Sequence, residues 1–78
     1  MNWREHIERK PGVMSGKPVI KGTRITVEHI LERLGDGWSQ DELTKSYPHI
    51  TVEAIRAALQ FAARSLASDE SVFLSESA

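Results

Sequence analysis

A chain of 78 residues has room for one small domain, because a chain of this size buries only about 60% of the surface that it exposes when unfolded. Apolar residues make up 40% of the sequence and charged residues 27%, ordinary globular values that exclude wholesale disorder and fibrous structure. The absence of cysteine excludes a disulfide framework and a thiolate zinc site. We therefore expect such a small domain to gain stability by association, as a homodimer.

The sequence predicts a cytoplasmic protein without a membrane-spanning segment. It contains no run of about 18 apolar residues, the length that a transmembrane helix needs. Residues 1–10 include two glutamates and lack the apolar stretch of a signal peptide.

Charge is distributed unevenly along the chain. Residues 4–24 carry six basic side chains and two glutamates, a net charge of +4. Residues 69–78 have a net charge of -3 and contain a short apolar cluster, Val72, Phe73 and Leu74. We expect residues 1–68 to form one domain and residues 69–78 to be an acidic, flexible tail.

Glycines and prolines interrupt the first 25 residues so often that a long helix cannot form there. The interrupting residues are Pro11, Gly12, Gly16, Pro18 and Gly22. The stretches between them can form strands at residues 6–9, 13–14 and 19–20. The Pro11-Gly12 pair predicts a turn with a positive φ at the glycine. Residues 1–25 are therefore expected to form a short β hairpin or an extended arm.

Residues 26–68 are predicted to form three helices, each preceded by a Ser or Thr that can cap its first turn. The caps are Thr26, Ser39 and Thr51, and Glu42 completes a capping box with Ser39. The helices are expected at residues 27–34, 40–46 and 52–67. This order predicts a mainly α fold with a three-helix, homeodomain-like helix-turn-helix core, and the alternative is a generic three-helix bundle.

The third helix is apolar on more than one side. The expected core face consists of Ile55, Ala58, Leu59, Ala62 and Leu66. A second apolar sector consists of Ala54, Ala57 and Phe61. We expect a second subunit or another partner to cover this sector, and the alternative is that the N-terminal arm of the same chain covers it.

Basic and amide side chains suggest contacts with DNA. The candidates are Lys17, Lys21 and Arg24 in the arm and Arg56 and Gln60 on the third helix. Residues 36–56 have a net charge of -2, which argues against strong DNA binding by the helix-turn-helix itself. Two alternatives stay open. The first is that Arg56 and Gln60 are ordinary solvated surface. The second is that residues 16–24 have a structural role, in which Thr23 bonds locally and Arg24 pairs with Glu28 or Glu32.

The sequence carries no pattern typical of a metal site or an enzyme. Its histidines, His6, His29 and His49, are far apart along the chain, and none forms a pair at i,i+4. Residues 12–18 differ from a phosphate-binding loop in spacing and have proline where the magnesium-binding hydroxyl would stand. We therefore expect no metal, no cofactor, no small-molecule substrate and no catalytic residues.

Residues 16–59 resemble the family known as domain of unknown function 433. The shared positions are Gly16, Lys17, Pro18, Lys21, Gly22, Thr23, Arg24, Ile25, Val27, Gly37, Ser39, Glu42, Leu43, Tyr47, Pro48, Ile50 and Thr51. The resemblance implies a homeodomain-like helix-turn-helix behind a small β element. It also implies an antitoxin-like role beside a PIN-like ribonuclease toxin in a bacterial two-gene module.

The resulting hypothesis is a homodimeric, antitoxin-like module. It would bind the toxin through Val72, Phe73 and Leu74 of the tail, and operator DNA through the arm and the third helix. The alternative is a non-enzymatic protein-interaction module that does not bind DNA.

Overall fold

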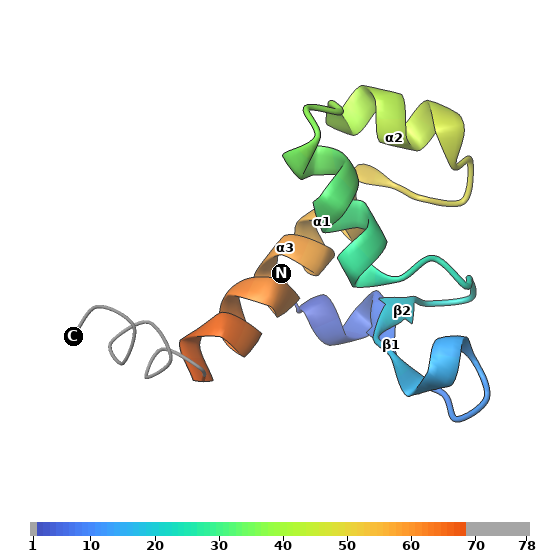
Figure 1. Cartoon of the computed structure of the whole chain (residues 1–78). Coiled ribbons are helices and arrows are strands. Elements are labelled where there is room, and N and C mark those ends of the chain that lie inside the picture. Colours follow the sequence, from blue (N-terminus) through green and yellow to red (C-terminus); the bar gives the residue numbers. More distant parts are fainter. Residues whose placement is uncertain (1, 69–78) are drawn as a thin grey trace.

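The computed structural model describes residues 2–68 and has the predicted mainly helical architecture, with three helices and a two-stranded hairpin (Figure 1). The elements in chain order are η1 (Trp3–Glu5), β1 (Ile7–Glu8), η2 (Met14–Gly16), β2 (Val19–Ile20), α1 (Val27–Gly35), α2 (Gln40–Ser46) and α3 (Val52–Ser68). The N-terminal turn η1 lies against α3, whose second half extends away from α1 and α2 (Figure 1).

The hairpin pairs two very short antiparallel strands. Ile7 lies opposite Ile20 and Glu8 lies opposite Val19, and the three apolar residues of these pairs are buried. The N–H of Val13 donates to the carbonyl of Lys10 (3.0 Å), which closes the turn.

Parts of the N-terminal prediction are confirmed and parts are wrong. Gly12 has a φ of 85°, as the Pro11-Gly12 turn requires. The strand predicted at residues 13–14 is absent, because Met14 and Ser15 adopt φ values of 48° and 59° and form a 3-10 turn. The single turn η1 was also not predicted. It is a short 3-10 turn that the Asn2 side chain caps by accepting the N–H of Arg4 at 3.1 Å.

All three predicted helix caps are confirmed. The hydroxyl oxygen of Thr26 accepts the N–H of His29 at 3.0 Å, and that of Thr51 accepts the N–H of Ala54 at 3.1 Å. Ser39 and Glu42 form the reciprocal capping box, with bonds of 3.0 and 3.1 Å. Each cap satisfies a helix amide that has no partner within the helix, so each helix begins where the sequence predicts.

The end of α1 is fixed by Gly37, which has a φ of 98°. The N–H of Gly37 donates to the carbonyl of Leu34, and the N–H of Trp38 donates to that of Arg33, both at 3.0 Å. This pair of bonds closes a helix that ends in a left-handed residue, a conformation that glycine adopts without strain.

The core lies where the three helices meet the hairpin. Ile30 of α1, Leu43 of α2 and Ile55 of α3 are fully buried. Full burial of one such side chain contributes about 1.5 to 3 kcal/mol. A hydrogen bond of 2.8 Å between His29 Nε2 and the Tyr47 hydroxyl also ties α1 to the end of α2.

The face of α3 that enters the core differs from the prediction. The buried residues are Ala54, Ile55, Ala57 and Ala58. Leu59 and Leu66, predicted to be in the core, are 41% and 61% exposed. This orientation arises because η1 and β1 also pack on α3, whose second apolar sector includes Ala54, Ala57 and Phe61.

The expectation that a second subunit covers Ala54 and Ala57 is therefore wrong, since both are buried within the chain itself. Phe61 is half-buried, and its ring packs edge-on against Trp3 with centroids 5.0 Å apart at 75°. The alternative prediction, that the N-terminal arm of the same chain covers this sector, is confirmed at Phe61.

Candidate functional site

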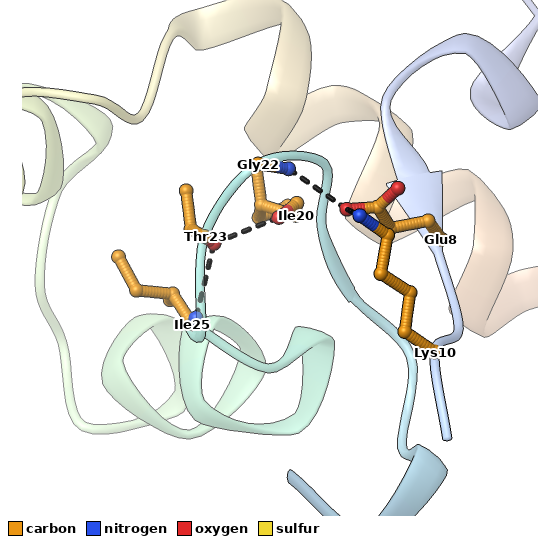
Figure 2. Close-up of polar contacts among 6 residues, drawn as sticks. All are labelled: Glu8, Lys10, Ile20, Gly22, Thr23 and Ile25. Carbon is orange, nitrogen blue, oxygen red and sulfur yellow. Dashed lines mark hydrogen bonds and ion pairs between the residues drawn. The ribbon is translucent and has the colours of Figure 1, made fainter. Parts of the chain in front are cut away.

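The loop of residues 21–24 connects β2 to α1, and two of its backbone N–H groups donate hydrogen bonds to the hairpin side; Figure 2 shows the one from Gly22. The N–H of Lys21 donates to the carbonyl of His6 at 2.8 Å. The N–H of Gly22 donates to a carboxylate oxygen of Glu8 at 2.9 Å, a contact that Figure 2 shows as a dashed line. The loop is thus anchored to β1, more than ten residues earlier in the chain.

Thr23 fixes the same loop from within, as the sequence predicts (Figure 2). Its hydroxyl donates to the carbonyl of Ile20 at 2.7 Å and accepts the N–H of Ile25 at 3.0 Å. Its own N–H donates to the same carbonyl at 3.0 Å. One side chain therefore spans the whole turn between the strand and the helix.

Gly22 is required by the conformation of the backbone rather than by space. Its φ is 78°, and a Cβ added there would meet no atom within 4 Å. We expect Gly22→Ala to lower the free energy of unfolding by about 1 kcal/mol, because alanine disfavours a positive φ. Gly22→Asn should lower it less, because asparagine tolerates the left-handed region.

Urea denaturation followed by circular dichroism measures both changes. Equal losses for Ala and Asn would show that Gly22 is needed for a reason other than its backbone conformation.

Lys21 and Arg24 are exposed, and their side chains take no part in these hydrogen bonds. Within residues 2–68, neither side chain forms an ion pair. The predicted pairing of Arg24 with Glu28 is wrong, since Lys17 reaches Glu28 at 3.1 Å. The loop therefore presents two cations on a fixed backbone.

The other predicted pairing of Arg24, with Glu32, is also wrong. The Glu32 carboxylate lies 4.0 Å from Arg33, whose guanidinium makes a closer contact of 3.0 Å with Asp36. Both interactions lie at the end of α1, where a basic side chain also complements the helix dipole.

The five DNA-binding candidates lie in different parts of the fold. Lys17 is held against α1 by its ion pair, whereas Lys21 and Arg24 project from the loop. Arg56 and Gln60 are both exposed on α3. Gln60 shares a shallow hollow with Asn2, Trp3, Arg4, Ala63 and Arg64, so it belongs to the surface near η1.

A second candidate site is an open apolar groove of about 270 Å³ between α1 and the second half of α3. Its lining consists of Pro18, Val27, Glu28, Leu31, Phe61, Ala62, Ser65 and Leu66. Most of these residues were not predicted as a site. The sequence signal for it was that the third helix stays apolar near its C-terminal end, at Ala62 and Leu66.

Two further findings concern the described part of the chain alone. Within residues 2–68, no three His, Asp or Glu side chains are grouped as metal ligands would be. None of the helices there is long and apolar enough to cross a membrane. The tail residues Val72, Phe73 and Leu74 lie outside the described residues, so their role stays a prediction.

The comparisons with known proteins agree with the fold and name a family. Residues 7–62 match the family described as "Protein of unknown function (DUF433)". The chain is 31% identical over 59 residues to the uncharacterized protein y4eO of Sinorhizobium fredii. That match covers 76% of this chain but only 27% of the relative.

A solved structure is similar as well. The crystal structure of a DUF433 member protein from Anabaena variabilis has a TM-score of 0.74 and 31% sequence identity. The similarity covers 80% of this chain and 61% of the Anabaena chain, so the crystallised protein has further residues beyond the shared fold. With the family pattern matched over most of its length, the chain belongs to the DUF433 family.

Proposed function

We propose that this chain is a non-enzymatic binding module of the antitoxin type, whose partner is a PIN-like ribonuclease toxin. The observation that carries the proposal is the open apolar groove between α1 and α3. The partner would insert an apolar helix or strand there, and residues 69–78 of this chain would add a second, acidic contact.

The exposure of the groove favours a protein segment as its occupant. Leu66 at its edge is 61% exposed, and Phe61 and Leu31 are half-buried. Contact with a partner would remove this apolar area from water, which stabilises a complex by about 25 cal/mol per Å² before the costs of association. A small molecule is enclosed in most binding pockets, whereas a helix or strand can lie along an open groove.

A charge in the groove tests the proposal. We expect Leu66→Asp to weaken binding to the protein encoded by the adjacent reading frame by about tenfold or more, because the carboxylate must be desolvated in the complex. Met14→Asp is the matched control, since Met14 is similarly exposed (45%) but lies in the hairpin loop.

Titration calorimetry with the purified proteins measures both affinities, and circular dichroism confirms that both variants are folded. Unchanged affinity for Leu66→Asp, or the same loss for both variants, would contradict a role for the groove.

Operator DNA is a second candidate ligand, favoured by the net charge of +4 in residues 4–24. The predicted homodimer is part of this proposal, because two copies would double the number of contacts. Ala54 and Ala57 are buried within the chain, so they do not form its contact. A complete lack of DNA binding at low salt by a verified dimer would leave the protein-binding function alone.

A further inference from the structure

We propose that Lys21 and Arg24 bind the phosphodiester backbone of duplex DNA, so that the β2–α1 loop, and not α3, is the contact surface. This inference rests on the second candidate function and assigns it to particular residues. It concerns the two exposed cations of the loop, which form no ion pair with any of residues 2–68.

The loop backbone is held in place before any ligand arrives. The N–H of Lys21 donates to the His6 carbonyl, next to β1. The N–H of Gly22 donates to Glu8 of β1, and Thr23 bonds to Ile20 and Ile25 (Figure 2). A charged side chain on a fixed backbone loses less conformational entropy on binding than one on a mobile segment. The bonding therefore prepares the two cations for a ligand that lies across the loop.

The carboxylates around the loop are already engaged. Glu8 accepts the Gly22 N–H at 2.9 Å and lies 3.8 Å from Lys10. Glu28, in the first turn of α1, pairs with Lys17 at 3.1 Å. An anionic ligand would therefore meet Lys21 and Arg24 without first displacing a partner among residues 2–68.

The composition of the loop favours a phosphate backbone over an acidic protein. Protein interfaces combine charge with apolar anchors, and the exposed positions of this loop, Lys21, Gly22 and Arg24, offer none. Phosphate groups are bound by Lys and Arg side chains without such anchors. The positive end of the α1 dipole lies close by, since α1 begins at Val27.

The helix-turn-helix itself is a poorer surface for DNA. Residues 36–56 have a net charge of -2, and Glu53 stands one turn before Arg56 on α3. A phosphate near Arg56 would therefore also meet a carboxylate on the same helix, which opposes binding.

The salt dependence of DNA binding separates the two surfaces. Fluorescence anisotropy with a labelled duplex compares the wild type, Lys21→Gln/Arg24→Gln, and the control Lys45→Gln/Arg56→Gln. Both variants remove two exposed positive charges, the first from the loop and the second from α2 and α3. We expect the loop variant to lower the slope of log K against log salt concentration by about 2 per protomer, and the control to keep most of it.

Three results would overturn the inference, and each identifies a different failure. If the wild type does not bind the duplex at low salt, the DNA-binding function fails together with the inference. If only the control loses slope, DNA binding stands and the contact lies on the helix-turn-helix. If polyglutamate competes as well as DNA does, and through the same two residues, the ligand is an acidic protein. Thermal unfolding of both variants confirms that they fold as the wild type does.

Discussion

Replacement of Ile55 by alanine should lower the free energy of unfolding by about 2 to 5 kcal/mol, the range for deletion of a large aliphatic side chain from a core. Ile55 is fully buried, and its helix meets both α1 and α2. The substitution removes apolar area and leaves a cavity that the surrounding backbone can close only in part. A domain of this size has a total stability of only about 3 to 5 kcal/mol, so much of the variant should be unfolded at 25 °C.

Urea denaturation followed by circular dichroism measures the loss. Leu59→Ala is the control, since Leu59 belongs to the same helix but is 41% exposed. That control should lose less than about 1 kcal/mol, because its side chain is already partly in water. Similar losses in the two variants would mean that α3 presents a different face to the core.

Replacement of Trp3 by alanine should lower the free energy of unfolding by about 2 to 3 kcal/mol, less than for a fully buried aromatic residue. Trp3 packs edge-on against Phe61 with ring centroids 5.0 Å apart. The guanidinium of Arg4 lies 4.6 Å from the centre of the Trp3 ring and adds a cation–π contact. Loss of the indole would uncover Phe61 and release the N-terminal turn from α3.

A double-mutant cycle between Trp3→Ala and Phe61→Ala isolates the contact between the rings. We expect a coupling energy of about 0.5 to 1.5 kcal/mol, the usual value for an edge-to-face pair. The same cycle between Trp3→Ala and Leu59→Ala should be additive. Additivity in the Trp3 and Phe61 cycle would contradict the packing of the arm on α3.

The helices could be predicted closely because their signals are local. Each cap is a side chain that bonds to an amide three residues later, so the positions of Thr26, Ser39 and Thr51 alone define the helix starts. The ends of α1 and α3 each lie one residue beyond the prediction, at Gly35 and Ser68. Such local bonds do not depend on how the helices pack.

The orientation of α3 could not be predicted in the same way. Its sequence carries apolar residues on two sides, and periodicity alone does not say which side faces α1 and α2. The deciding contact is made by Trp3, which lies far from Phe61 in the sequence. Leu66, which periodicity places in the core, lies instead at the open groove.

The candidate loop was predicted only in part, because some of its bonds join near neighbours in the sequence and others do not. The bonds of Thr23 join near neighbours, and the sequence indicated them. The bond from Gly22 to Glu8 depends on the register of the hairpin, which places Glu8 beside β2. The ion pair of Lys17 with Glu28 likewise depends on how the hairpin meets α1, so the wrong basic residue was assigned to that carboxylate.

The contact between Trp3 and Phe61 also sets an order of events during translation. Ribosomes add residues from the N-terminus at about 5 to 20 per second, so the indole leaves the exit tunnel several seconds before the phenylalanine that receives it. Until then the turn η1 has no helix to pack against. Packing of this fold is therefore completed by a segment that is translated before the helix it packs on.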